Sequence, residues 1–375
     1  MRILIASAFD PIPSDNTSAG RYRFLAEALQ ALGHEVLWIT SQFFHGGKCM
    51  RSLEDEWIDG IRYVKVPAIA YASNMGMLRV VNHWQLGRGA RTVLQRLFTT
   101  ELPDVIVCAS PPLYWCNVIL RWAKDHNIKT VLDMQDNWPK ALESVQPFLY
   151  KTTLDALPFH LLNKKNRELC TAITAVAESY LTRVDDKPHE VFYLGAPVKE
   201  IQSMTAVQSA VKEEKLTLVF LGHTGQNDAL ANFLDSIDVA EIQVKVIGTC
   251  SDSRIVHHPA VLYKGPLYNQ ALYSELATAH FGLFIDDGYK EIRMPNKLFY
   301  YWACGLPVLG VQLTGEAVRW VKLLQGIVVP EARVDAAQLK QHLAGVNAGE
   351  IQTLAQEYFV KETIYSGFAR FITRL

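Results

Sequence analysis

The sequence predicts an α/β protein of two doubly wound domains, and three observations lead to this fold class. Short apolar runs, typical of buried parallel strands, alternate with amphipathic helical segments along the 375 residues. The alternation occurs in two consecutive series, and each series opens with a strand followed by a glycine-containing loop. Residues 196–215 between the series are polar and lack a strong apolar period, so we interpret them as a linker.

The first domain is expected over residues 1–197. An apolar strand at residues 2–7 leads into a polar loop and then into a helix over residues 20–32, whose apolar side chains share one face. The next strand is predicted at residues 36–40, which completes a βαβ unit. Further strand-like runs occur at residues 62–66, 104–109, 129–132, 172–176 and 191–194.

The second domain is expected over residues 198–350. It opens with a strand at residues 216–221, which is followed by the glycine-containing loop 222–225. Further strands are predicted at residues 244–248, 261–263, 282–285, 307–311 and 327–329. The final segment, residues 351–375, is amphipathic, and we expect it to pack back on the first domain as a helix.

The composition argues against several classes of protein. Hydrophobic residues make up 49% of the chain and charged residues 20%, which fits a folded globular protein. The net charge of -1 gives no electrostatic reason to expect a nucleic acid partner. The six cysteines form no CxxC or zinc-type spacing, so we expect reduced core thiols and no metal site. No signal peptide and no apolar run near the ~20 residues of a membrane span are evident, which predicts a cytoplasmic protein.

The most specific stretch covers residues 279–307 and the residues just after it, and it contains MPNKLFYYWACGLPVLG. This sequence resembles the donor-binding element of GT-B glycosyltransferases, whose pattern runs P-x-K-x-x-E-Y-x-A-x-G-x-P-V. The matching residues are Pro295, Lys297, Tyr301, Ala303, Gly305, Pro307 and Val308. The resemblance implies the GT-B fold, in which two Rossmann-like domains face a central cleft. It also implies a UDP- or GDP-linked sugar as co-substrate, with no further cofactor.

The chemistry of this element suits a nucleotide diphosphate. Pro295 is typical of a helix start, and the free N–H groups and positive dipole end of a first turn attract anions. Lys297 adds a full positive charge in the same turn, and we count it as a candidate catalytic residue. The alternative interpretation is that proline and glycine here are ordinary helix punctuation.

The sequence departs from the usual pattern at two positions. Tyr300 and Ile292 stand where the large family-4-like group of retaining enzymes carries glutamates, and the chain here looks more like the xanthan glucuronosyltransferase type. No DxD motif is evident, which fits a metal-independent enzyme. The resemblance implies donor contacts from Gly222, His223, Thr224, Gly265, Pro266, Leu267, Glu291, Met294, Pro295, Asn296, Lys297 and Tyr300.

Two stretches of the first domain are candidates for binding the acceptor. A loop of small residues leads into the first helix with Ser18, Ala19, Gly20 and Arg21. A buried strand ends within TVLDMQDNWP and directs Asp133 and Asp136 toward the ligand-binding edge of the sheet. A carboxylate can remove the proton of an acceptor hydroxyl there, so Asp136 is the candidate general base. Alternatively, Asp136 only turns the chain, or it positions the acceptor in a retaining enzyme.

Residues 60–100 contain no acidic residue and six basic ones, Arg62, Lys65, Arg79, Arg88, Arg91 and Arg96. Large apolar side chains such as Leu78 and Trp84 lie among them. This composition is typical of a segment that lies on an anionic membrane, where each basic side chain contributes about 1 kcal/mol. Residues 157–167 have a similar character. The alternative is an ordinary amphipathic helix with a solvated basic face.

These features predict a hexosyltransferase-type glycosyltransferase, peripheral on the inner face of the plasma membrane. Its acceptor would be a lipid-linked glycan of cell-surface polysaccharide or lipopolysaccharide synthesis. One alternative is a nucleotide-sugar 2-epimerase, which shares the architecture and needs no membrane-facing surface. Another is a non-catalytic protein that binds nucleotide or glycan and supports a partner transferase, which the changes at Ile292 and Tyr300 favour.

Overall fold

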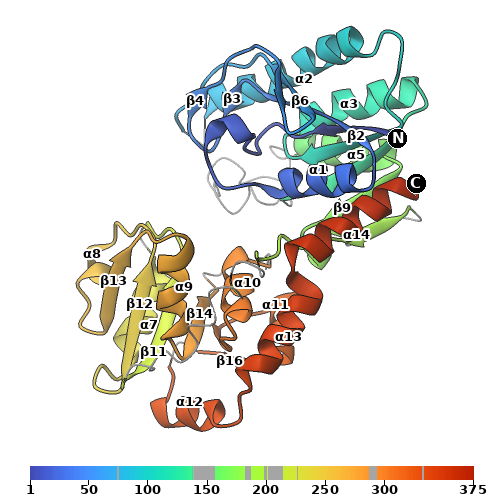
Figure 1. Cartoon of the computed structure of the whole chain (residues 1–375). Helices are drawn as coiled ribbons and strands as arrows, with labels where there is room; N and C mark the ends of the chain where they lie inside the picture. The colour runs from blue at the N-terminus through green and yellow to red at the C-terminus, as the bar shows by residue number, and fades with distance from the viewer. Residues whose placement is uncertain are drawn as a thin grey trace. The chain divides into compact units, whose positions relative to one another are not determined.

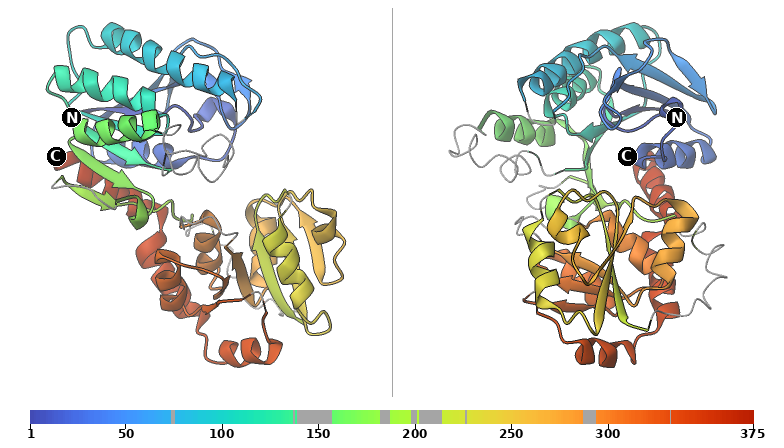
Figure 2. Two further views of the ribbon diagram at one scale, coloured as in Figure 1. Left: turned by 180° about the vertical axis from the view of Figure 1, so that it is seen from behind. Right: turned by 90° about the vertical axis from the view of Figure 1, so that its left-hand side faces the viewer.

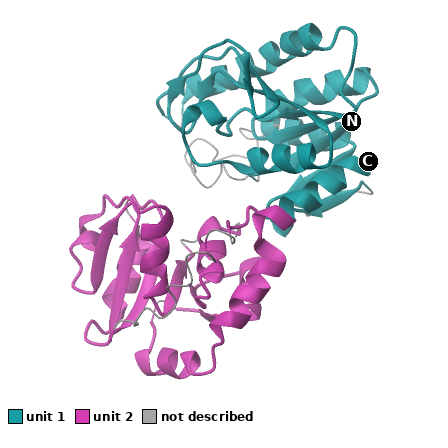
Figure 3. Cartoon of the chain, viewed as in Figure 1, with its two compact units in different colours: residues 1–193, 364–375 teal, residues 194–363 magenta. Residues whose placement is uncertain are grey.

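The chain forms two compact units. The computed structural model describes residues 1–73, 76–136, 138, 157–181, 187–197, 201, 214–225, 227–286, 294–331 and 333–375. Unit 1 comprises Met1–Tyr193 together with Ile364–Leu375, and unit 2 comprises Leu194–Thr363 (Figures 1 and 3). The sequence-based boundary at residues 197 and 198 thus lies four residues beyond the junction between the units. Each unit is an α/β structure around its own sheet.

Unit 1 is built on an eight-stranded sheet in the order β10-β9-β8-β7-β1-β2-β6-β5. The strands are β1 (Arg2–Ala6), β2 (Glu35–Ser41), β5 (Glu56–Ile58), β6 (Ile61–Val66), β7 (Val105–Ser110), β8 (Lys129–Met134), β9 (Ala172–Ala175) and β10 (His189–Val191). All neighbours pair in parallel except β5 and β6, which are antiparallel. A separate antiparallel pair is formed by β3 (Phe43–Phe44) and β4 (Cys49–Met50).

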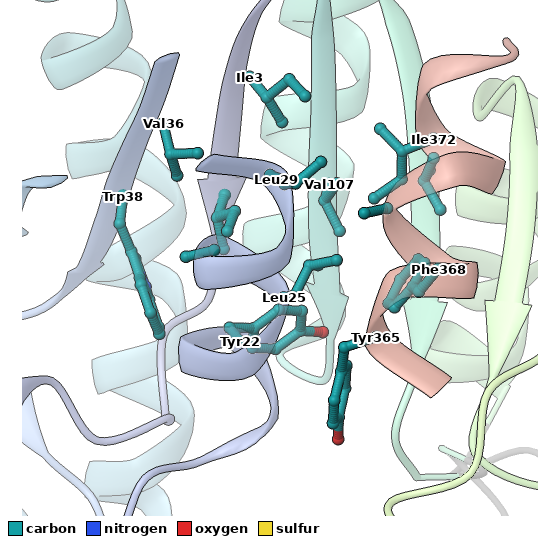
Figure 4. Packing of buried hydrophobic residues seen from close by; sticks show 14 of the residues in the cluster. Ile3, Tyr22, Leu25, Leu29, Val36, Trp38, Val107, Tyr365, Phe368 and Ile372 are labelled. Atoms are coloured by element: carbon teal, nitrogen blue, oxygen red, sulfur yellow. The ribbon is translucent and has the colours of Figure 1, made fainter. Parts of the chain in front are cut away.

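The helices of unit 1 pack on this sheet and bury its apolar strands. They are α1 (Arg21–Ala31), α2 (Met77–Leu97), α3 (Leu113–Asp125), α5 (Leu157–Leu169) and α14 (Lys361–Thr373). Short 3₁₀ turns lie at Pro13–Asp15 and Glu178–Leu181. Tyr365, Phe368 and Ile372 of α14 share one buried cluster with Ile3 of β1 and Leu25 of α1 (Figure 4). Burial of each such side chain contributes about 1.5–3 kcal/mol, which anchors the end of the chain to unit 1.

Unit 2 contains an all-parallel six-stranded sheet in the order β13-β12-β11-β14-β15-β16. Its strands are β11 (Leu216–Leu221), β12 (Ile242–Ile247), β13 (Val261–Gly265), β14 (Phe281–Ile285), β15 (Val308–Val311) and β16 (Ile327–Val329). Figure 2 shows helices on either side of these strands. The helices are α7 (Asp228–Ser236), α8 (Ser253–Val256), α9 (Asn269–Ala277), α10 (Asn296–Ala303), α11 (Glu316–Leu323), α12 (Ala336–Leu343) and α13 (Ala348–Phe359).

The two sheets share one topology. In each sheet, the first three long strands of the chain lie in sequence from the middle toward one edge, and the next three lie in sequence from the middle toward the other edge. This is the Rossmann order 3-2-1-4-5-6. The order reverses between β1 and β7 in unit 1 and between β11 and β14 in unit 2. Ligands of open α/β sheets bind beyond the carboxyl ends of the strands near such a reversal. The predicted fold class, two doubly wound Rossmann-like domains, is confirmed.

The C-terminal segment differs from the expectation that all of residues 351–375 pack on the first domain. Only Ile364–Leu375 belongs to unit 1, and α13 belongs to unit 2. The reason is Phe359, whose ring lies 5.2 Å from that of Trp302 and 4.8 Å from that of Trp320. Across the described residues, no helix combines the length and apolar character needed to cross a membrane.

Candidate functional site

Three glycines meet at the carboxyl ends of adjacent strands in unit 2. Gly222 follows β11, Gly248 follows β12 and Gly265 ends β13, and all three have positive φ angles. The Gly222 N–H donates to the Ile247 carbonyl (3.0 Å), and the Gly248 N–H donates to the Gly265 carbonyl (2.8 Å). A Cβ at Gly248 would lie 2.0 Å from the Gly222 carbonyl oxygen, so the close approach requires glycine. Sequence reasoning missed Gly248, although it follows a strand just as Gly222 does.

Lys297 lies beside this glycine edge. It is the second residue of α10, whose N-cap is Pro295, and its side chain is half-buried. Its Nζ lies 4.1 Å from the ring centroid of Phe220 and 5.4 Å from that of Phe284. A Cβ on Gly222 would be 3.6 Å from the same nitrogen. The structure therefore brings together the glycine loop and the helix start that the sequence singled out separately, and places a cation there.

The other predicted donor residues vary in their surroundings. His223 is exposed and its Nδ1 contacts Thr249 Oγ1, whereas Thr224 is buried and its N–H donates to the Thr249 carbonyl (2.8 Å). The Tyr300 ring stacks on that of Tyr273 at 6.4 Å. Met294 is buried, Leu267 is half-buried, and Pro266 and Asn296 are exposed like His223. Glu291, Ile292 and Asp287 lie outside the described residues.

Tyr301 fixes the end of β11, directly before Gly222. Its fully buried hydroxyl accepts from the Leu221 N–H (2.9 Å) and donates to the Leu283 carbonyl (3.3 Å). We expect Tyr301→Phe to lower the free energy of unfolding by about 1–3 kcal/mol, because both backbone groups lose their partner. Urea unfolding followed by circular dichroism measures this loss. The same change at Tyr268, which is 75% exposed, should have little effect, and equal losses at both positions would contradict the argument.

In unit 1, Arg21 and Asp133 form a buried ion pair. Two hydrogen bonds join them, Arg21 Nε to Asp133 Oδ2 (2.8 Å) and Arg21 Nη2 to Asp133 Oδ1 (3.0 Å). The Tyr22 and Thr174 hydroxyls each donate to the same carboxylate at 2.7 Å. Burial alone would raise the pKa of Asp133, but the Arg21 charge and these hydrogen bonds lower it.

This pair involves two residues that the sequence singled out for the acceptor. Arg21 and Asp133 were predicted to contact the acceptor, yet their side chains are 1% and 0% exposed. Arg21 also donates to the Phe192 carbonyl (2.7 Å), and its guanidinium lies 5.0 Å from the Phe368 ring centroid. The contacts of the two side chains join α1, β8, β9 and α14 within unit 1.

The remaining acceptor candidates lie nearer the surface of unit 1. Ser18 and Ala19 are exposed, and Gly20 is the N-cap of α1. A Cβ on Gly20 would lie 2.8 Å from Asp10 Oδ1, so Gly20 and Asp10 lie close together. Asp136, two residues beyond β8, is half-buried.

Asp10 is a half-buried carboxylate that the sequence did not single out. It accepts from Ser7 Oγ (2.9 Å) and Gln135 Nε2 (3.3 Å), and burial raises its pKa. It adds a carboxylate to the edge that carries Gly20 and Asp136. Within the described residues, no group of three or more metal-ligating side chains is assembled.

The basic residues of segment 60–100 fall into three groups. Arg62 and Lys65 pair with Asp55 (2.6 Å) and Glu56 (2.5 Å), so they do not form part of a free basic surface. Arg79 packs over the Trp138 ring at 5.2 Å. The exposed residues are Arg88, Arg91 and Arg96, all on α2.

Residues 19–195 match the glycosyl transferase 4-like domain. The chain contains a GT4-like glycosyltransferase domain. This domain covers most of unit 1, including Gly20 and Gln135 beside Asp10. No curated protein matches the sequence.

Solved structures resemble the chain over its full length. HepE of Anabaena in complex with UDP is 12% identical, with both chains covered to 100% and a TM-score of 0.66. An α,α-trehalose-phosphate synthase (UDP-forming) from Burkholderia vietnamiensis is 10% identical, with both chains covered to 100% and a TM-score of 0.62. AviGT4, a glycosyltransferase involved in avilamycin A biosynthesis, is 14% identical, with 100% of this chain and 97% of that chain covered and a TM-score of 0.57. These likenesses establish the GT-B fold.

Proposed function

We propose that the chain transfers a sugar from a UDP- or GDP-linked donor to a lipid-linked glycan at the inner face of the plasma membrane. Cell-surface polysaccharide or lipopolysaccharide synthesis is the process that would use this reaction. The observation that carries the proposal is the position of Lys297 beside the glycine edge of β11, β12 and β13.

The donor's diphosphate would lie at the start of α10. First-turn N–H groups there point outward, and Lys297 supplies the full positive charge that a leaving nucleotide diphosphate needs. The nucleotide would extend over Gly222 and Gly248 toward Gly265, where glycine lets the backbone approach closely. UDP is the favoured nucleotide, because HepE was solved with UDP and the trehalose-phosphate synthase is UDP-forming.

The acceptor would bind at the ligand edge of unit 1. Ser18 and Ala19 are exposed before α1, Gly20 is its half-buried N-cap, and Asp136 offers a carboxylate after β8. In the proposed reaction Asp136 removes the proton of the acceptor hydroxyl as that oxygen attacks the anomeric carbon of the donor. The nucleotide diphosphate leaves with the electrons of the broken glycosidic bond, and Lys297 stabilises its charge.

Helix α2 carries the features expected of membrane contact. Five large apolar side chains of its first half are 38–76% exposed, namely Met77, Leu78, Val80, Val81 and Trp84. Three exposed arginines continue the helix, and the Arg88 guanidinium lies 4.7 Å from the Trp84 ring centroid. An apolar stretch followed by cations suits a surface of anionic lipid headgroups.

A double substitution in α2 tests this contact. We expect Leu78→Ser with Trp84→Ser to weaken binding to phosphatidylglycerol vesicles at least tenfold, because each large apolar side chain contributes about 1.5–3 kcal/mol when buried. Vesicle co-sedimentation measures the affinity. Trp57→Ser removes a tryptophan that is 69% exposed outside α2 and should leave binding unchanged. Equal binding by the double variant and the wild type would refute membrane contact through α2.

A panel of nucleotide sugars, incubated with and without membrane lipid extract, tests the transfer reaction itself. Release of nucleotide from one donor only when lipid is present supports the proposal. Epimerised nucleotide sugar without any acceptor would instead identify a 2-epimerase. Nucleotide binding without turnover on any donor or lipid would identify a non-catalytic partner of another transferase.

A further inference from the structure

Four rings from separate segments of unit 1 form a row near the carboxyl ends of its strands. Phe9 lies 5.0 Å from His45 and 5.5 Å from His83, and His83 lies 5.8 Å from Trp138, measured between ring centroids. Phe9 follows β1, His45 follows β3, His83 is on α2 and Trp138 follows β8. We call these four residues the ring row. Convergence of four segments at this edge of a parallel sheet is the arrangement expected of a ligand site.

Two cations flank the ring row. The Arg79 guanidinium lies 5.2 Å from the Trp138 ring centroid and is hydrogen-bonded to the Tyr71 hydroxyl. Lys48 Nζ lies 4.7 Å from the Tyr71 ring centroid and 3.3 Å from His45 Nδ1. Tyr71 thereby links the two cations, and its hydroxyl is 2.5 Å from His45 Nδ1. Both cations can donate to an anion near the rings.

The histidines of the ring row are neutral at pH 7. Burial, followed by the charges of Lys48 and Arg79, lowers the pKa of His45 to about 4. Burial, with the charges of Arg79 and His45, lowers the pKa of His83 to about 3. A neutral imidazole offers one donor and one acceptor, which suits the hydroxyls of a sugar.

His83 also has an unused hydrogen-bonding atom. Its Nε2 is buried and has no hydrogen-bond partner among the described residues. Buried polar atoms are normally satisfied by protein, water or ligand, so this nitrogen is available to a hydroxyl that enters the ring row.

We propose that the ring row, Arg79 and Lys48 form the subsite for a phosphate-bearing sugar of the acceptor. The sugar would pack against the rings and hydrogen-bond to His83, and the phosphate would lie on Arg79 and Lys48. This inference rests on the proposed function and names the chemistry of its acceptor. On α2, Arg79 and His83 contact the ring row while Leu78 and Trp84 are exposed, so one helix would contact both a membrane and a charged headgroup.

Calorimetric titration of the full chain with three probes tests the subsite. The probes are glucose 1-phosphate, inorganic phosphate and UDP, and the variants are Arg79→Gln, Trp138→Leu and the control Arg121→Gln on the exposed surface of α3. We expect Arg79→Gln to weaken binding of both phosphate probes at least tenfold. Trp138→Leu should weaken the binding of glucose 1-phosphate tenfold but leave the binding of inorganic phosphate unchanged, because it removes a ring and no charge.

UDP binding reports on unit 2 and should be the same in every variant, and an unchanged thermal unfolding transition of unit 1 verifies that the substituted unit is folded. Absence of saturable glucose 1-phosphate binding to the wild type, or unchanged affinity in Arg79→Gln, would overturn the subsite. If the transfer assay fails while glucose 1-phosphate still binds in a way that depends on Arg79, the proposed function is wrong and the subsite stands. A fourth probe, glucose linked to farnesyl diphosphate, distinguishes the sources of the ligand. If it binds more tightly than glucose 1-phosphate and this binding is lost in Arg79→Gln, the ligand is a lipid headgroup rather than a soluble sugar phosphate.

Discussion

We expect Lys297→Gln to lower kcat/KM for the nucleotide-sugar donor by roughly 10²–10³-fold, the range seen when one preorganised electrostatic donor is removed from an active site. The Lys297 side chain is half-buried, and its Nζ is held over the rings of Phe220 and Phe284, so its charge is already positioned before the donor arrives. Glutamine keeps most of the side-chain length but removes the positive charge. Initial rates over a range of donor concentrations measure the effect.

Lys322→Gln on α11 is the matched control. It makes the same chemical change at an exposed lysine of the same unit, and it should leave the rate within twofold of wild type. A comparable loss of kcat/KM in both variants would mean that the substitution acts through the overall charge of the protein. An unchanged kcat/KM in Lys297→Gln would show that this residue takes no part in the mechanism. A fall in kcat together with kcat/KM indicates that Lys297 acts on the leaving diphosphate rather than only on ground-state binding.

The sequence predicted the fold well because the central strands of both sheets, such as β1, β7 and β11, are short, buried and parallel. The run at residues 2–7 became β1 and the run at residues 216–221 became β11, each followed by its glycine-containing loop. Such strands are apolar on both faces, so composition alone marks them. Strands β3 and β4 are two residues long and β5 is three residues long, too short to form an apolar run, and they were not predicted.

Candidate site residues could be proposed from the sequence only where a local motif marks them. Pro295 and Lys297 belong to one contiguous element, and the loop at Gly222 follows a strand, so spacing identified both. In contrast, the partner of Asp133 is Arg21, 112 residues away. No local sequence pattern distinguishes a carboxylate that contacts an acceptor from a buried carboxylate whose hydrogen bonds are all made within the protein. The ring row has the same difficulty, because its four residues come from four segments that only the folded sheet brings together.

We expect Asp133→Asn to lower the free energy of unfolding of unit 1 by about 3–5 kcal/mol, because it leaves the Arg21 guanidinium buried without a counter-charge. For a unit of this size the melting temperature should fall by roughly 6–20 °C. Calorimetry measures this shift, and hydrogen exchange should locate it in β1 and β8 rather than in β11. Asp59→Asn is the control, since its pair with Arg23 is 64% exposed on the aspartate side and contributes about 1 kcal/mol or less.

The pH dependence of this loss of stability shows whether it comes from the ion pair or from side-chain packing. Burial alone would raise the pKa of Asp133, but the Arg21 charge lowers it below the value of about 3.9 in the unfolded chain. A carboxyl whose folded pKa is depressed contributes stability that is fully present above the unfolded pKa and is lost as pH falls through the folded pKa. The difference in the free energy of unfolding between wild type and Asp133→Asn should therefore be constant, at about its full value, from pH 5 to 7. It should become smaller below about pH 4. A difference that stays constant into the acid range would show that asparagine disturbs the packing around Tyr22 and Thr174 rather than the charge on Asp133.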